Sequence, residues 1–272
     1  MFPSKVKAKL ARNEPVLITC LHLMDATVFE IASHMGFDGI WVDMEHHVHS
    51  VETVQQMFRA ARMGSGSDIM ARPAKGEYTR MMRMLEAGAH GILYPRCSDA
   101  DEAGRVVQAM KFHPQGTRGF DGGNRDMPYC TMDMNEYLHF ANDNTFLFAQ
   151  IEEPEAVENV DRIAAVEGVD ALFFGPGDFT VMSGIPGQLN HPIVTEALKK
   201  IQAAAKRAGI HWGMPVGTPQ RARELLDMGA GFVCAGADML MVRMGLERIQ
   251  SEYGELGFKF DNQMPNRSEY LP

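Results

Sequence analysis

The sequence predicts an α/β fold, a single-domain (β/α)8 TIM barrel, from three observations. Eight short apolar runs alternate with longer amphipathic stretches along the 272 residues. Each run has four or five residues, as expected for parallel strands that are covered on both faces. The length of the chain and its hydrophobic content of 45% suit one barrel of roughly 250 residues.

The eight predicted strands leave room for a helix after each one, which is the order that a barrel requires. They are residues 16–20, 39–43, 68–72, 91–95, 146–150, 171–175, 211–215 and 232–235. No glycine-rich dinucleotide-binding motif follows the first strand, which disfavours an open doubly wound sheet. We expect residues 1–272 to form one domain, with the polar segment 254–272 as a tail on the surface or against a neighbouring subunit.

Helix boundaries are marked by residues that cap or stop helices. Ser50 is the expected N-cap of a helix after the second strand, and Pro154 is expected in the first turn of another. Ser98 and Asp101 have the spacing of a capping box. Gly209 is expected to end the helix before the seventh strand.

Composition and charge exclude several classes of partner. The formal net charge is −9 and the basic residues form no stripe, so we expect no nucleic-acid binding. No apolar stretch approaches the ~20 residues that cross a bilayer, and no secretory signal is visible at the N-terminus. The four cysteines are scattered, which is typical of reduced thiols in a cytoplasmic protein.

Polar residues follow four of the predicted strands at the ends where barrel enzymes place their active sites. Several ionisable groups that face one mouth raise each other's desolvation cost, so their convergence indicates a site. The second strand ends at Asp43, Glu45 and His46, the third at Arg72, the fifth at Gln150 and Glu152, and the sixth at Gly175, Pro176, Gly177 and Asp178.

These residue types suit the formation of an enolate. Glu152 and Asp178 come from adjacent strands and can hold a hard divalent cation. His46 is the expected general base, and Arg72 can stabilise an enolate or bind a carboxylate. The glycines around Pro176 let the backbone approach a ligand closely.

The chain resembles the metal-dependent (class II) 2-oxo-acid aldolases typified by 2-dehydro-3-deoxyglucarate aldolase and 4-hydroxy-2-oxoheptanedioate aldolase, within the aldolase/citrate lyase superfamily. The resemblance extends from about residue 15 to residue 249 and depends on the order of several short motifs. The most specific are Asp43-Met44-Glu45-His46, Gln150-Ile151-Glu152, Gly168-Val169-Asp170 and Gly175-Pro176-Gly177-Asp178, supported by Gly36-Phe37-Asp38, Gly88-Ala89-His90-Gly91-Ile92 and Gly116-Thr117-Arg118-Gly119.

The resemblance implies a carbon–carbon lyase that reversibly cleaves a hydroxy-2-oxo acid to pyruvate, or a close 2-oxo acid, and an aldehyde. Glu152 and Asp178 would hold Mg²⁺, Mn²⁺ or Co²⁺. Gln150 and the backbone from Gly175 to Asp178 would contact the 2-oxo acid, while Arg72 would stabilise the enolate.

The resemblance also implies how the acid–base chemistry and the assembly are organised. His46 would move the proton of the aldol hydroxyl through a metal-bound water, and Asp43 and Glu45 would orient it. Glu86 stands where the family commonly has an Asp that raises the basicity of the histidine. The protein would be a homo-oligomer, a hexamer assembled from dimers that exchange their last helix.

Several alternatives remain beside the aldolase. Decarboxylation of oxaloacetate needs the same enolate, whereas lyase action on an acyl-CoA needs a basic groove that the sequence lacks. A Schiff-base aldolase needs a lysine in the barrel mouth, and only Lys75 closely follows a strand. A barrel that binds 2-oxo acids without turnover is the non-enzymatic alternative. His22, after the first strand, departs from the family pattern and can reshape the aldehyde pocket.

Overall fold

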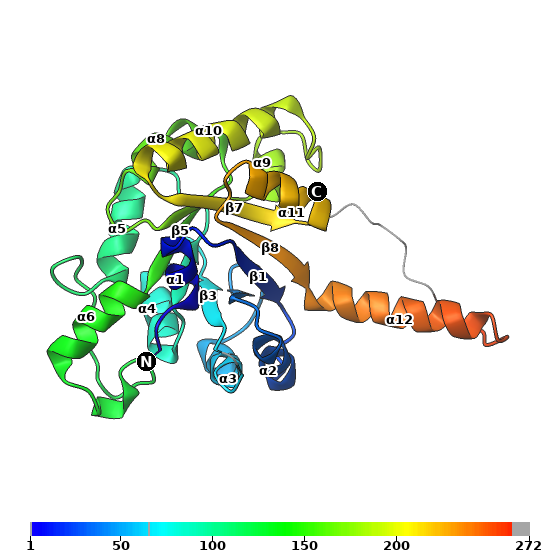
Figure 1. Cartoon of the computed structure of the whole chain (residues 1–272), viewed down its shortest axis with the longest axis horizontal. Helices are drawn as coiled ribbons and strands as arrows, with labels where there is room; N and C mark the ends of the chain where they lie inside the picture. The colour runs from blue at the N-terminus through cyan, green and yellow to red at the C-terminus, as the bar shows by residue number, and fades with distance from the viewer. Residues whose placement is uncertain (1, 65, 263–272) are drawn as a thin grey trace.

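Residues 2–64 and 66–262 of the chain are described by a computed structural model (Figure 1). Eight parallel strands close into a barrel in sequence order, and β8 pairs with β1 to complete it. The strands are β1 (Val16–Leu21), β2 (Gly39–Asp43), β3 (Asp68–Arg72), β4 (Gly91–Tyr94), β5 (Phe146–Ile151), β6 (Ala171–Phe174), β7 (His211–Val216) and β8 (Phe232–Ala237). All eight predicted strands are confirmed, and so is the (β/α)8 fold.

Helices connect the strands and surround the barrel (Figure 1). They are α1 (Lys5–Ala11), α2 (Ala26–His34), α3 (Val51–Ala61), α4 (Tyr78–Ala87), α5 (Ala100–Met110), η1 (Pro128–Cys130), α6 (Met134–Asn144), α7 (Pro154–Glu158), α8 (Val160–Ala164), α9 (Pro176–Met182), α10 (Pro192–Ala208), α11 (Pro219–Asp227) and α12 (Asp238–Gly254). Within the described ranges, no helix has the length and apolarity needed to cross a membrane.

The helix signals in the sequence hold at most boundaries. Ser50 caps α3 by accepting the Thr53 N–H at 3.1 Å, and Gly209 ends α10 in the left-handed conformation. The predicted cap of α5 is wrong by one residue: Asp99 accepts the Glu102 N–H at 2.7 Å, whereas the hydroxyl of Ser98 donates to the carbonyl oxygen of Arg96.

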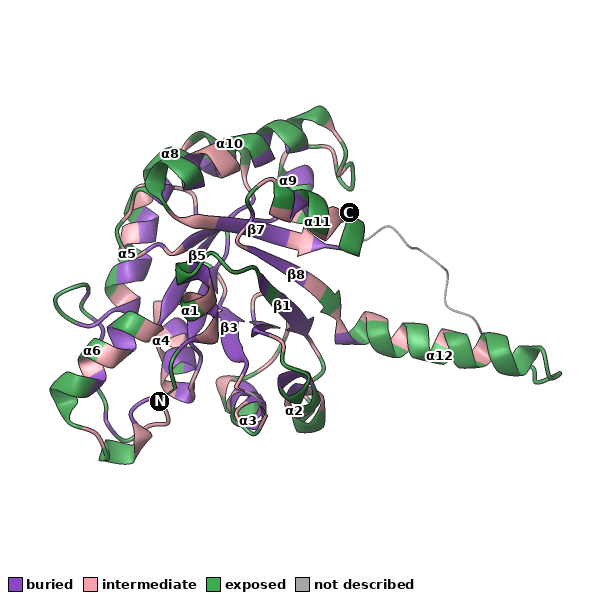
Figure 2. Cartoon of the chain, viewed as in Figure 1, coloured by how far each residue is buried: buried purple, intermediate pink, exposed green. Residues whose placement is uncertain are grey.

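Two apolar layers hold the barrel together. Inside it, side chains that alternate along the strands form one cluster, which includes Ile18, Met70, Phe148, Phe173 and Phe232. Outside it, the opposite strand faces pack against the helices in a larger cluster. Figure 2 shows the buried strands at the centre of the molecule and the exposed outer faces of the helices.

The last helix departs from this arrangement. Figure 1 shows α12 extending away from the barrel, and Asp238 is its one buried residue among those described. Gly236 adopts φ 82°, and the register of β8 on β1 shifts at this point, which turns the chain outward. The side chain of Leu17 on β1 is 40% exposed, so part of the outer barrel face is left without a covering helix.

Candidate active site

The ends of β2, β3 and β5 bring their polar residues to one rim of the barrel. Successive strand residues point to opposite faces, so Asp43, Arg72 and Gln150 continue the inward-facing rows of their strands. All three are buried, as is Glu152 just beyond β5. The structure therefore brings these predicted site residues together.

Arg72 is held in a fixed orientation at the centre of this rim. Its Nε and Nη2 donate to the two carboxylate oxygens of Asp43 at 2.9 and 2.7 Å. Burial alone would raise the pKa of Asp43, but the hydrogen bonds and charge of Arg72, together with the backbone N–H groups of Glu45 and His46, keep that pKa below its usual value. The remaining nitrogen, Nη1, lies 3.5 Å from Oε1 of Gln150 and is the donor left to meet a ligand.

Three carboxylates at this rim affect one another's ionisation. Burial raises the pKa of Glu152 to about 8; Arg72 lowers it, whereas the charges of Asp178 and Glu45 raise it further. Burial likewise raises the pKa of Glu45, whose Oε2 has no hydrogen-bond partner among the described residues. An orphaned buried oxygen and mutually destabilised carboxylates fit a divalent cation, whose charge would relieve both.

The turn after β6 shapes the wall opposite Arg72. A Cβ atom at Gly175 would lie 2.4 Å from Oε2 of Glu152, so glycine is required where the backbone passes the carboxylate. Pro176 begins α9 at its first position and Asp178 lies in the first turn. Gly175, Pro176, Gly177 and Asp178 line the cavity together with His46, Arg72 and Gln150.

His46 lines the cavity, and two further histidines contact each other after β1 and β2. The side chain of His46 is 58% exposed, and its Nε2 lies 3.7 Å from Oε2 of Glu45. The ring of His22 lies 4.8 Å from that of His47, and its Nδ1 lies 3.4 Å from Oδ1 of Asp238. His22 therefore contacts the first residue of α12, and its predicted effect on the aldehyde pocket stays a prediction.

Two contributors to the site were not identified from the sequence. Trp41 lines the cavity, with its ring centroid 4.8 Å from the guanidinium carbon of Arg72. Its position two residues before Asp43 could have identified it, because residues i and i+2 of a strand point to the same face. The backbone N–H of Arg96 donates to Oε1 of Glu152 at 2.9 Å, and no sequence pattern marks this contact.

Within one chain Glu86 does not lie at this rim, and its predicted role beside His46 stays a prediction. It lies at the C-terminal end of α4, and a helix that follows a strand ends where the strands begin, at the opposite end of the barrel. Burial raises the pKa of Glu86, and its charged neighbours are Arg118, Asp121, Asp126 and Arg83.

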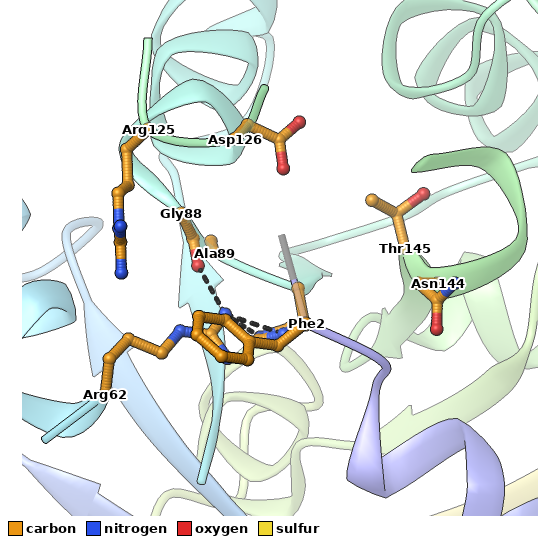
Figure 3. Close-up of a pocket in the computed structure, with 9 residues that line it drawn as sticks. Phe2, Arg62, Gly88, Ala89, Arg125, Asp126, Asn144 and Thr145 are labelled. Atoms are coloured by element: carbon orange, nitrogen blue, oxygen red, sulfur yellow. Dashed lines mark hydrogen bonds between the residues drawn. The ribbon is translucent and has the colours of Figure 1, made fainter. Parts of the chain in front are cut away.

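A small pocket at that opposite end has a structural role. Figure 3 shows the ring of Phe2 over the guanidinium of Arg62, which donates to the carbonyl oxygen of Gly88 at 3.2 Å. Arg62 also contacts the buried ring of His90, which in turn lies 3.4 Å from Asp68. These paired groups hold the beginnings of neighbouring strands together, and polar groups at this face of a barrel typically serve stability.

The one lysine that closely follows a strand end is held away from the cavity. Nζ of Lys75 donates to the carbonyl oxygen of Arg96 and to Oγ of Ser98, both at 2.6 Å. It also pairs with Glu102 at 3.1 Å. A Schiff-base mechanism would need this amine to be free and directed into the mouth.

Comparisons with known proteins agree with this geometry. Residues 19–244 match the family described as HpcH/HpaI aldolase/citrate lyase. The chain is 32% identical over 253 residues to a 5-keto-4-deoxy-D-glucarate aldolase of Klebsiella pneumoniae, covering 93% of this chain and 98% of the relative. A Salmonella arizonae protein of the same name is 33% identical over 254 residues, with the same two coverages.

Solved structures give the same result. An HpcH/HpaI aldolase/citrate lyase family protein from Burkholderia cenocepacia superposes with a TM-score of 0.85 at 30% identity, covering 92% of this chain and 99% of that one. An HpcH/HpaI aldolase from Desulfitobacterium hafniense gives 0.83 at 29% identity, covering 90% and 96%. Aldolases of this family cleave hydroxy-oxo acids to pyruvate and an aldehyde and depend in general on a divalent metal. The chain belongs to the HpcH/HpaI aldolase/citrate lyase family and is a carbon–carbon lyase of its aldolase type.

Proposed function

We propose that this aldolase cleaves a hydroxy-2-oxo diacid such as 5-keto-4-deoxy-D-glucarate, releasing pyruvate and an aldehyde that carries a carboxylate. The name of the relatives at 32–33% identity supports this substrate. The observation that carries the chemistry is the buried, hydrogen-bonded set of Asp43, Arg72, Gln150 and Glu152 at one rim of the barrel.

In this proposal Glu152 and Asp178 hold the divalent cation, with Mg²⁺, Mn²⁺ and Co²⁺ all suited to carboxylate ligands. When bound, the ion would supply Lewis-acid polarisation of the 2-oxo group. Gln150 donates its amide to Glu152 and fixes the orientation of that carboxylate. Gly175, Pro176 and Gly177 provide the backbone wall against which the 2-oxo acid binds.

The side chains of the protein then have separate roles in the reaction. Nη1 of Arg72 donates to the oxygen that becomes the enolate oxygen, because the other two guanidinium nitrogens already donate to Asp43. His46 takes the proton of the aldol hydroxyl on its ring nitrogen and returns it in the reverse direction. Glu45, between Arg72 and His46, orients that ring.

The test separates enolate formation from recognition of the aldehyde. Proton NMR of pyruvate in D2O should show loss of the methyl signal with protein and Mg²⁺, and no loss when EDTA replaces the ion. Cleavage of 5-keto-4-deoxy-D-glucarate should follow the same metal dependence. Full metal-stimulated activity in both His46→Ala and Glu152→Ala would disprove these roles.

Oxaloacetate provides a control on the reaction type. Its decarboxylation needs the enolate but no aldehyde pocket. Turnover of oxaloacetate without any aldol reaction would therefore show that the protein is a decarboxylase and not an aldolase.

We further propose a cytoplasmic homo-oligomer, a hexamer assembled from dimers, in which α12 packs on another copy. Four free cysteines, three of them buried, support the reducing compartment. The apolar residues of α12 support the assembly, since they are exposed in one chain: Met239, Met241, Val242, Met244, Leu246, Ile249 and Tyr253. Exposed apolar area of this kind is typical of an interface.

A further inference from the structure

We infer that Arg96 is a positioning residue for the metal site: its left-handed backbone directs its N–H to Glu152, and Lys75 holds that conformation. The inference rests on the proposed function, because it concerns a carboxylate that would bind the divalent cation there. It also gives a role to Lys75, whose amine is held away from the cavity.

Arg96 follows β4 with a backbone conformation that residues with a side chain rarely adopt. Its φ is 50°, in the left-handed region where the Cβ atom crowds the backbone. Strained conformations of this kind persist only where surrounding contacts hold them, and they concentrate at functional sites. The conformation of Arg96 is therefore maintained by its contacts.

The left-handed turn points two successive N–H groups at the end of β5. The N–H of Arg96 donates to Oε1 of Glu152 at 2.9 Å, and that of Cys97 donates to the carbonyl oxygen of Gln150 at 3.0 Å. Successive N–H groups share a direction only where the backbone leaves the extended form, as it does at a left-handed residue. A hydrogen bond donated to a carboxylate favours its ionised form, which is the form that binds a cation.

The N–H of Arg96 also completes the orientation of the Glu152 carboxylate. The side-chain amide of Gln150 donates to the other oxygen, Oε2. With a donor on each oxygen, the carboxylate resists rotation, and its remaining lone pairs keep one direction for a cation. Glu152 is 1% exposed, so water does not readily replace a donor that is lost.

Two charged side chains hold Arg96 in place. Nζ of Lys75, in the loop after β3, donates to the carbonyl oxygen of Arg96 at 2.6 Å, and Lys75 is itself paired with the buried Glu102 at 3.1 Å. Nε of Arg96 donates to Oε1 of Glu153 at 2.6 Å, but the Arg96 side chain is 44% exposed and such pairs contribute little. The contact of Lys75 is with the backbone, so it remains when residue 96 is replaced.

The experiment measures the Kd of Mn²⁺ from the EPR signal of the free ion and compares two substitutions at position 96. Arg96→Gly and Arg96→Val both remove the side chain and keep the N–H, but only glycine adopts the left-handed conformation without strain. Arg96→Gly should keep the Kd within about threefold of the native value, whereas Arg96→Val should raise it about 10-fold or more, as expected when a partner that orients a metal ligand is lost. Lys75→Met should raise it at least about threefold, whereas Lys200→Met, at an exposed pair with Glu158, should not.

Asn13→Val separates an effect on the metal site from backbone strain in general. Asn13 is exposed and left-handed at φ 55°, and it precedes β1 at the opposite end of the barrel. Its variant carries the same strain and should keep the native Kd. Equal values of Kd in Arg96→Gly and Arg96→Val, or in Asn13→Val and Arg96→Val, would overturn the inference.

A native Kd in Lys75→Met would also overturn it, because the Arg96 turn would then need no support from that amine. Glu152→Gln distinguishes this failure from failure of the proposed function. A native protein that does not bind Mn²⁺, or a Glu152→Gln variant that binds it as tightly as the native protein, would overturn the proposed metal site, and this inference with it.

Discussion

Glu152 lies in surroundings that favour its protonated form. Burial raises its pKa from 4.5 to about 8. Between these values the folded chain keeps a proton that the unfolded chain has lost, so the fold loses stability as pH rises. The slope is at most about 1.4 kcal/mol per pH unit for one group.

We therefore expect the Tm of the metal-free protein to fall between pH 5 and 8, and Glu152→Gln to reduce that fall. Glutamine keeps the shape and has no charge to bury. Thermal unfolding in EDTA across this range measures the effect, with the exposed Glu158→Gln as control. Equal slopes in Glu152→Gln and native protein would show that Glu152 is already ionised in the folded chain.

Arg72 acts through geometry as well as charge. Replacement by lysine keeps the charge but loses the two parallel hydrogen bonds to Asp43 and the planar contact with Trp41. We expect Arg72→Lys to slow pyruvate exchange by about 10²- to 10³-fold. Arg207→Lys, at an exposed ion pair with Asp161, should leave the rate within about twofold. Comparable rates of pyruvate exchange in both variants would show that the reaction does not need the hydrogen-bond geometry of the Arg72 guanidinium.

At the scale of elements, the sequence predicts strands better than helix ends. The apolar runs identify all eight strands because a strand buried on both faces needs a continuous apolar sequence. The single helix expected after Pro154 is two, α7 and α8, which meet at Asn159. The side chain of Asn159 donates to the carbonyl oxygen of Ser98 at 3.0 Å, a tertiary contact that no local pattern reveals.

The turn between β6 and α9 provides a test at this scale. Gly175→Ala would place a methyl group 2.4 Å from Oε2 of Glu152, so that carboxylate must move. We expect the variant to fold and its rate of metal-stimulated pyruvate exchange to fall at least about tenfold, since a small displacement of a group in an active site lowers the rate strongly. Gly104→Ala on α5 is the control, because its Cβ meets nothing within 4 Å. Unchanged activity in Gly175→Ala would mean that Glu152 tolerates displacement.

At the scale of the molecule, the sequence identifies most of the residues on one rim, whereas the role predicted for Glu86 stays a prediction. Strand-end residues are predictable, because every parallel strand delivers its C-terminal residue to the same end of the barrel. The position of a helix residue depends on which end of the helix it occupies, and Glu86 lies at the far end of α4. Residues 263–272 of the predicted tail lie outside the described residues.

The exposed face of α12 makes a prediction about the whole assembly. Met244 and Ile249 are 64% and 49% exposed in one chain, which is costly unless another copy covers them. We expect native protein to elute as an oligomer in size-exclusion chromatography with light scattering. The double variant Met244→Glu and Ile249→Glu should dissociate it, because each buried charge would lack a partner.

Met134→Glu tests whether any added surface charge has this effect. Met134 is 50% exposed at the start of α6, which lies on the other side of the barrel from α12 (Figure 1), and its variant should keep the native mass. The β1 face near Leu17 should become protected from hydrogen exchange only in the oligomer, since α12 of the same chain does not cover it. A native protein that is monomeric at micromolar concentration would show that α12 does not exchange between copies.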